Sequence, residues 1–213
     1  MVLLSLMCKV NKMRDYEDQL YLDNKVIAGV DEVGRGPLFG PVVAACVVLA
    51  KDFFLEGLND SKKLSAKKRE KFNDYILKNC LAYAIVEVSS DEIDQINIYQ
   101  ASKKAIEKAI LKVNQKIKID HVLVDAMPIN LKINSTSIIK GDQKSISIAA
   151  ASVVAKVYRD QLMDKFDNKF PQYNFKKNRG YPTKEHLVLI KKYGIVKGYR
   201  KSFKPVKEVL DAN

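Results

Sequence analysis

The chain has 213 residues, of which 47% are apolar and 29% are charged, so it is long enough to bury a hydrophobic core as one domain. This balance excludes a disordered chain and a fibrous one. Lys and Arg number 37 against 25 Asp and Glu, and the resulting formal charge of +12 favours a polyanion such as nucleic acid as a partner.

The numbers and spacing of cysteines and histidines limit the kinds of disulfide and metal site that the chain can form. The cysteines Cys8, Cys46 and Cys80 form no CxxC pair and the chain has two histidines, so we expect neither a disulfide framework nor a zinc site of thiolates or imidazoles. Metal binding by carboxylate oxygens stays open. No apolar run approaches the ~18 residues of a membrane helix, and the apolar start lacks the basic segment of a signal peptide. We therefore expect a cytoplasmic protein.

The first part of the chain alternates apolar runs with turn signals. Two β-branched runs, 25–33 and 41–49, are separated by RGPLFG and predict a hairpin near the centre of a sheet. Apolar residues at helical spacing predict a helix over 64–77 with Ser65 as its cap, and the alternating segment 81–88 predicts a third strand.

The second part begins with a turn at Ser90, whose neighbours Asp91, Glu92 and Asp94 we expect in solvent. The remaining predicted elements are, in chain order, a helix over 98–113, a short buried strand at 121–125, a polar strand-like stretch at 135–140, a long helix over 145–166, a helix over 183–192 and a short one after Pro205. This order is typical of an α/β protein with a mixed sheet and helices on its faces. We expect one domain over 1–213, with 1–24 as a leading segment of no assigned structure.

Four carboxylates lie where acids are unusual. Asp31 and Glu32 interrupt an apolar strand, Asp125 ends another, and Asp142 follows the segment IIKG. An ionised carboxylate at the interior end of a strand needs a counter-charge, which Mg²⁺ or Mn²⁺ can supply. Each acid alone could instead be a turn residue or an ion-pair partner. Asp31 and Glu32 can serve one site only at a bulge or a strand end, because neighbours on a strand point to opposite faces.

Glycines and basic residues surround these acids. Gly34, Gly36 and Gly40 allow positive φ and close approach to a ligand, although a tight hairpin would need similar residues. Arg35, between two of the glycines, suits a phosphodiester. Most lysine runs are solvated surface, but further phosphate contacts could come from Lys62, Lys63, Lys144, Lys156, Arg159, Lys176, Lys177 and Arg179.

Tyr181 lies between Gly180 and Pro182 in a rigid loop. Such a tyrosine can stack on a sugar or base, or support the loop, and composition alone favours support.

The sequence resembles the bacterial ribonuclease HII family, the type 2 ribonucleases H, from about residue 26 onward. The matching segments come in the family's order: AGVDEVGRGPLFGPVVAA at 28–45, LNDSKKLS at 58–65, EIDQINI at 92–98, VLVDA at 122–126, KGDQ at 140–143, ISIAAASVVAKVYRD at 146–160, FPQY at 170–173, GYPTKEHL at 180–187 and SFKPVK at 202–207. The type 3 relative typically has Lys where this chain has Arg35, and it carries an extra domain before the first acid.

The resemblance implies a ribonuclease H-like fold, with a mixed five-stranded sheet flanked by helices and a C-terminal helical region, about 170–213, that binds substrate. It implies an endoribonuclease that hydrolyses the RNA strand of RNA/DNA hybrids and incises 5′ to single ribonucleotides in duplex DNA, with a role in removing ribonucleotides from DNA. A clamp protein is one candidate partner, and we expect a monomer without membrane association.

The resemblance also assigns roles to residues. The implied catalytic and metal-binding acids are Asp31, Glu32, Asp125 and Asp142. The implied substrate-binding residues are Gly34, Arg35 and Gly36 at the RNA-to-DNA step, Tyr181 stacked on the following deoxyribose, and Lys62 on a phosphate. Asn178 and Tyr199 stand where many members have His, which could alter the grip on the duplex.

We predict catalysis by two Mg²⁺ or Mn²⁺ ions that gives 5′-phosphate and 3′-hydroxyl ends. Asp31 would bridge the ions, Glu32 and Asp125 would lie on the leaving-group side, and Asp142 on the water side. Two alternatives remain: another nuclease or strand-transfer protein on the same fold, and a non-catalytic basic module that binds nucleic acid.

Overall fold

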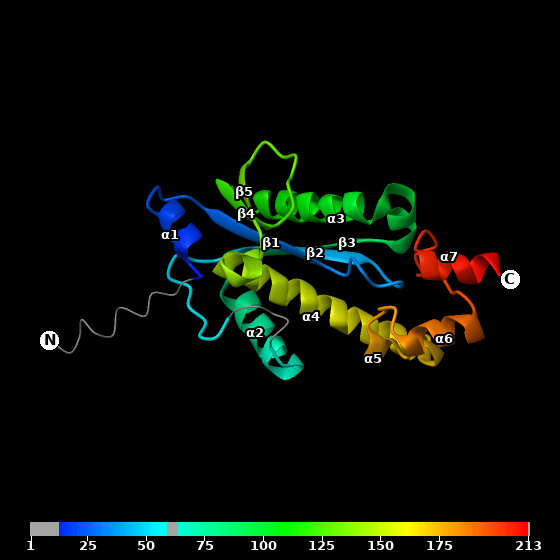
Figure 1. Ribbon diagram of the computed structural model, residues 1–213. Helices are drawn as coiled ribbons and strands as arrows, with labels where there is room; N and C mark the ends of the chain where they lie inside the picture. Colours follow the sequence, from blue (N-terminus) through cyan, green and yellow to red (C-terminus); the bar gives the residue numbers. More distant parts are fainter. Residues whose placement is uncertain (1–12, 59–63, 213) are drawn as a thin grey trace.

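A five-stranded sheet organises the computed structural model, which describes residues 13–58 and 64–212 (Figure 1). The first three strands form an antiparallel meander, and the last two run parallel to the first strand on its other side. In spatial order the strands are β3 (Ala82–Val88), β2 (Val42–Val48), β1 (Ile27–Val33), β4 (His121–Asp125) and β5 (Asn134–Ile138). The expected mixed sheet, with its hairpin near the centre, is confirmed.

Helices cover both faces of this sheet, with α3 on one face and α2 and α4 on the other (Figure 1). Helix α2 begins after Ser65, whose hydroxyl accepts a hydrogen bond from the amide of Lys68, as predicted. The helices are α1 (Asp15–Tyr21), α2 (Ala66–Asn79), α3 (Ser90–Asn114), α4 (Ile146–Lys169), α5 (Phe175–Asn178), α6 (Lys184–Tyr193) and α7 (Lys204–Asp211), with short 3-10 turns η2 (Gly141–Gln143) and η3 (Pro171–Tyr173).

The contact between α4 and β1 is unusually close, and it brings α4 beside the acids of β1. A Cβ at Gly29 of β1 would lie 2.1 Å from the carbonyl carbon of Ser147, so only glycine allows the helix to approach the strand at this point. Because both faces of β2 are buried, every residue from Val42 to Val48 is apolar and inaccessible to solvent.

A separate aromatic cluster joins the loop after β1 to the C-terminal helices. Phe39 stacks on Phe175 with ring centroids 4.1 Å apart, and Tyr199 meets Phe39 edge-on at 4.9 Å. Tyr173 packs against the same group. The segment from Pro37 to Pro41 is therefore fixed by residues from the end of the chain.

Two sequence predictions need correction. The turn expected at Ser90 is the first turn of α3, because the hydroxyl of Ser89 accepts a hydrogen bond from the Glu92 amide and caps the helix. A kink at Asn97, with φ of 66°, interrupts the apolar pattern, so the sequence does not show that the helix continues through it. The leading segment 1–24, which had no assigned structure, contains α1.

None of the helices in the described part of the chain is long and apolar enough to cross a membrane.

Candidate active site

Three of the four predicted acids line one pocket of about 350 Å³. Asp31 and Glu32 lie near the end of β1, and Asp125 is the last residue of β4. Val30 pairs with Val124 across these parallel strands, so the residues that follow them, Asp31 and Asp125, are neighbours. The register with β2 continues regularly through Asp31 and Glu32, so the strand end, and not a bulge, lets both side chains reach the pocket.

The pocket concentrates negative charge. Burial, and then the charges of Glu32 and Asp125, raise the pKa of Asp31 well above its usual value, against the opposing effect of a hydrogen bond from Ser152. Burial also raises the pKa of Glu32, an effect that the nearby Arg35 guanidinium partly offsets. A cation within this pocket would relieve both effects.

Asp142 lies beside this group but does not line the pocket. It is buried in η2, and the amide of its neighbour Gly141 donates to Asp125 Oδ1 at 2.7 Å. The structure therefore brings three predicted acids together. The fourth, Asp142, directly follows Gly141, whose amide contacts Asp125.

The loop Gly34 to Gly36 forms another wall of the pocket. Gly34 has φ of 95°, and a Cβ there would lie 2.3 Å from Nε of Arg159. Gly36 has room for a Cβ, which would lie 3.5 Å from the ring of Tyr181. Arg35 Nη1 is 3.5 Å from Glu32 Oε1, and its side chain is half exposed.

Two buried arginines hold the segment from Gly34 to Pro41 by its carbonyl oxygens. Arg200 donates to Gly34, Arg35 and Gly40 over distances of 2.6, 2.9 and 3.0 Å. Arg159 donates to the carbonyls of Phe39, Pro41 and Arg179. Arg159, which the sequence offered as a phosphate ligand, is fully buried and supports the loop instead.

Tyr181 faces the pocket from the C-terminal region, and 41% of its surface is exposed. Its carbonyl lies 2.8 Å from Nδ1 of His186, whose Nε2 lies 2.8 Å from the hydroxyl of Tyr199. Asn178 accepts from the Gly180 amide and donates to the Tyr173 carbonyl. Tyr199 and Asn178 thus both support the backbone around Tyr181.

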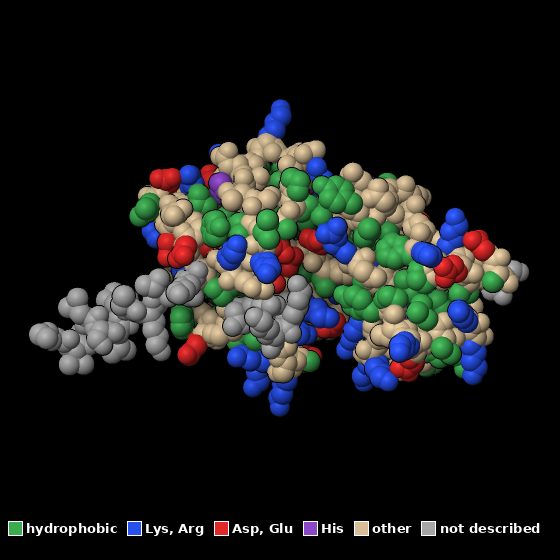
Figure 2. All heavy atoms as spheres, viewed as in Figure 1, with side chains coloured by type: hydrophobic (Ala, Val, Ile, Leu, Met, Phe, Trp, Pro, Cys, Tyr) green, Lys and Arg blue, Asp and Glu red, His purple; other side chains and the backbone are tan. Residues whose placement is uncertain are grey.

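Most of the other candidate cations already have partners. Lys156 lines the pocket but donates to Asp160 at 2.6 Å, Arg179 pairs with Asp164, and Lys177 pairs with Glu185. Lys62 and Lys63 lie outside the described residues. Figure 2 shows Lys and Arg side chains gathered along the lower edge of one face, over α2 and over the C-terminal helices. Of the candidate cations, Lys156 lines the pocket together with Arg35.

Comparison with known proteins decides between the remaining alternatives. The family model described as Ribonuclease HII matches residues 28–206, which include every site residue named above. The chain belongs to the ribonuclease HII family. Ribonuclease HII of Staphylococcus saprophyticus is 50% identical over 202 residues, which cover 94% of this chain and 78% of that protein.

Solved structures of relatives share the fold. Ribonuclease H2 from Pyrococcus horikoshii has a TM-score of 0.73 at 25% identity, covering 87% of this chain and 97% of that chain. The ribonuclease HII of a PCNA complex from Archaeoglobus fulgidus has a TM-score of 0.71 at 25% identity, covering 88% and 100%.

As a ribonuclease HII family member, the chain is a metal-dependent endoribonuclease that cleaves RNA in RNA/DNA hybrids and ribonucleotides embedded in DNA. The non-catalytic module and the strand-transfer protein are excluded.

The residues of the pocket fit a hard divalent cation in their chemistry. All the candidate ligands are carboxylates, and the buried Oε2 of Glu32 has no hydrogen-bond partner among the described residues. Within the same part of the chain, no three His, Cys, Asp or Glu side chains are already gathered as a metal site.

The sequence did not indicate three residues that shape this site. Ser152 hydrogen-bonds Asp31, Arg200 holds the glycine loop, and His186 holds the backbone of Tyr181. Ser152 could have been found from its position, since it is a polar residue on the buried face of α4. Arg200 carries no such signal, because its acceptors are backbone carbonyls far away in the sequence.

Proposed function

We propose that this chain cuts on the 5′ side of a ribonucleotide, in hybrids and in duplex DNA, and leaves 5′-phosphate and 3′-hydroxyl ends. The observation that supports this proposal is the shared lining of one pocket by carboxylates, a glycine loop and Tyr181. Water attacks the phosphorus, the bond from phosphorus to the 3′ oxygen of the preceding nucleotide breaks, and that oxygen takes up a proton. The biological role that follows is the removal of ribonucleotides from DNA.

We assign metal binding to Asp31, Glu32, Asp125 and Asp142. Two Mg²⁺ or Mn²⁺ ions, when bound, lower the pKa of the attacking water and stabilise the charge on the leaving oxygen. The unpartnered oxygen of Glu32 and the mutual repulsion of Asp31 and Asp125 support the assignment of the first three. The Gly141 amide, which holds Asp125, supports placing Asp142 at the edge of the same site.

We assign substrate binding to the glycine loop and to Tyr181. Only the 2′-hydroxyl distinguishes ribose from deoxyribose, so backbone atoms of Gly34 and Gly36 must approach it closely. The half-exposed Arg35 guanidinium contacts a phosphate, as does Lys62. The ring of Tyr181, on the far side of Gly36, stacks on the deoxyribose that follows.

The wider organisation is proposed on the same basis. Residues 1–213 form one catalytic domain, in which about 170–213 bind the duplex. This region supplies Tyr181, and its buried His186 and Arg200 hold the backbone of Tyr181 and of the glycine loop. The clamp protein considered above is a further proposed partner of this chain. The complex of the Archaeoglobus fulgidus relative with PCNA supports this proposal.

A labelled DNA duplex with one internal ribonucleotide tests the proposal. We expect incision 5′ to the ribonucleotide with Mg²⁺ or Mn²⁺ and none with EDTA. Asp125→Asn removes a charge from the pocket and should abolish turnover while the duplex is still bound in a mobility-shift assay. Asp91→Asn, on the exposed start of α3, is the matched control and should cut normally. Normal cutting by Asp125→Asn, or incision on the 3′ side, would refute the assignment.

A further inference from the structure

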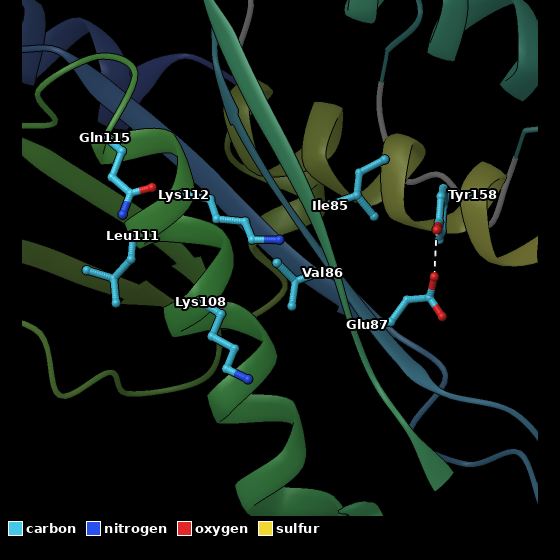
Figure 3. A pocket seen from close by; sticks show the side chains of 8 residues that line it. All are labelled: Ile85, Val86, Glu87, Lys108, Leu111, Lys112, Gln115 and Tyr158. Atoms are coloured by element: carbon cyan, nitrogen blue, oxygen red, sulfur yellow. Dashed lines mark hydrogen bonds between the residues drawn. The ribbon is translucent and has the colours of Figure 1, made fainter.

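A second groove, of about 530 Å³, follows the outer edge of β3 (Figure 3). Ile85, Val86 and Glu87 of the strand form its floor. Lys108, Leu111, Lys112 and Gln115 of α3 line one side, and Tyr158 of α4 lines the other. It shares no lining residue with the active-site pocket, and β2 separates its strand from β1.

The strand at the base of this groove is an edge strand, with which no further strand pairs within residues 13–58 and 64–212. The carbonyl of Tyr83 points outward, because it accepts a hydrogen bond of 2.9 Å from Lys116 Nζ. Since backbone groups of a strand alternate in direction, those of Ile85 and Glu87 face the same side as those of Tyr83. Lys116 protects one end of the edge, and the groove leaves the next two outward-facing residues accessible to a partner strand.

Around the groove, the acidic side chain has a hydrogen-bond partner, whereas two lysines form no ion pair among the described residues. Glu87 is engaged by the hydroxyl of Tyr158 at 2.6 Å, as the dashed line in Figure 3 marks. Lys108 and Lys112 are exposed, and within the described part of the chain neither forms an ion pair with a carboxylate. Figure 3 shows Lys112 reaching from α3 toward Val86. The groove thus offers two positive charges beside open backbone donors and acceptors.

We propose that this edge binds a short acidic segment of another protein, in extended conformation, as a sixth strand of the sheet. Alternate side chains of an added strand point to opposite faces. One set meets Lys108 and Lys112, and therefore should be Asp or Glu. The other set meets Ile85 and Tyr158 and should be apolar. Backbone hydrogen bonds supply affinity in this mode of binding, and the alternate side chains supply selectivity.

An acetylated and amidated pentapeptide of alternating glutamate and valine is a suitable probe. With a fluorescent label, it should bind the full chain in an anisotropy titration and slow hydrogen exchange at the Ile85 and Glu87 amides. The double variant Lys108→Glu and Lys112→Glu should weaken binding by about tenfold or more, because two attractions become repulsions. Lys67→Glu with Lys71→Glu, an exposed pair at the same spacing on α2, is the matched control and should bind normally.

Methylation of the peptide backbone tests the added strand directly. N-methyl groups on the residues whose amides face β3 should abolish binding, whereas methyl groups on the alternate residues should be tolerated. Binding that survives both patterns would overturn the proposal, as would equal weakening by the control pair. A dimer that the Lys108 and Lys112 variant dissociates would show that a second copy occupies the edge. Displacement of the peptide by a single-stranded oligonucleotide would assign the lysines to phosphate.

Discussion

Arg200 donates a hydrogen bond of 2.6 Å from Nη2 to the carbonyl of Gly34, although the two residues lie 166 positions apart. The same guanidinium also reaches the carbonyls of Arg35 and Gly40. The C-terminal region therefore determines the shape of a loop that follows the first strand of the chain.

Replacing the Arg200 guanidinium should disturb the position of the glycine loop more than the positions of the acids. We expect Arg200→Lys to lower the free energy of unfolding by about 3 kcal/mol, since it leaves buried carbonyls without donors. In the enzyme that still folds, KM for the ribonucleotide duplex should rise more than kcat falls. Denaturant titration and steady-state kinetics measure both effects. Lys201→Met, at the exposed next position, is the control, and a loss of kcat alone would contradict the positioning role.

The two glycines of the loop should respond differently to alanine. Gly34→Ala combines a positive φ with a Cβ placed 2.3 Å from Arg159, so we expect poor folding. Gly36→Ala meets only an ordinary contact with Tyr181, so its melting temperature should stay close to that of the unmodified chain. Its methyl group would nevertheless stand where the sugar must approach, and cleavage at a single ribonucleotide should drop at least tenfold. Unchanged cleavage by a folded Gly36→Ala enzyme would remove the backbone-sensing role.

His186 should make stability depend on pH. Burial lowers the pKa of His186 below its ordinary value of 6.5, so the unfolded chain takes up a proton first as the pH falls. Its contribution is complete above about pH 6.5 and is lost as the pH falls from there toward the folded pKa. Urea unfolding at pH 7.5 and 5.5 should show a smaller difference in His186→Gln than in the unmodified chain. Equal differences would contradict this role. Burial lowers the pKa of His121 as well, so some dependence should persist in the variant.

The salt dependence of duplex binding should report phosphate contacts. For each contact, the logarithm of affinity should fall by about 0.9 per logarithmic unit of salt. Arg35→Gln should reduce the magnitude of this slope by about 0.9, the value for one phosphate contact. Lys78→Gln, on the exposed side of α2, should leave the slope unchanged. A slope that is identical in both variants would show that Arg35 makes no phosphate contact.

Glu17 should be essential to the start of α4. Its buried carboxylate accepts from the hydroxyl of Ser145 at 2.5 Å and from the amide of Ser147 at 2.9 Å. We expect Glu17→Ala to cost about 2 to 4 kcal/mol of unfolding free energy, because two buried donors lose their acceptor. Asp18→Ala, on the exposed side of α1, should cost less than about 1 kcal/mol. Similar costs for both variants would show that the buried contact adds nothing.

The buried strands and the positions of the acids could be predicted from the sequence, because apolar runs with period-two or continuous patterns require a sheet interior. Helix α1 could not, since its inward-facing residue, Glu17, is an acid that reads as solvated surface. Asp94 was likewise expected in solvent, yet it accepts from the amides of Lys201 and Ser202. In each case the partners are backbone amides and serine hydroxyls distant in sequence, which no local pattern reveals.

The same limit applied to the candidate site. Asp31, Glu32 and Asp125 could be grouped because strand ends converge in a mixed sheet. The distinction between Arg35, which is half exposed, and Arg159, which is fully buried, depends on how the C-terminal helices pack. In the sequence Arg35 is a single cation beside the acids and Arg159 is a single cation within the long helix, and neither context reveals how deeply the side chain is buried.

Because Arg200 holds the glycine loop, this loop cannot take its final shape until the ribosome has synthesised Arg200. The strand that carries Asp31 and Glu32 leaves the ribosome well before the guanidinium that fixes the adjoining loop, because Arg200 follows Gly34 by 166 positions. A nascent or truncated chain that lacks Arg200 retains every acid and still has no fixed surface for a ribose. We therefore expect competence to cut only after the chain has been synthesised through Arg200.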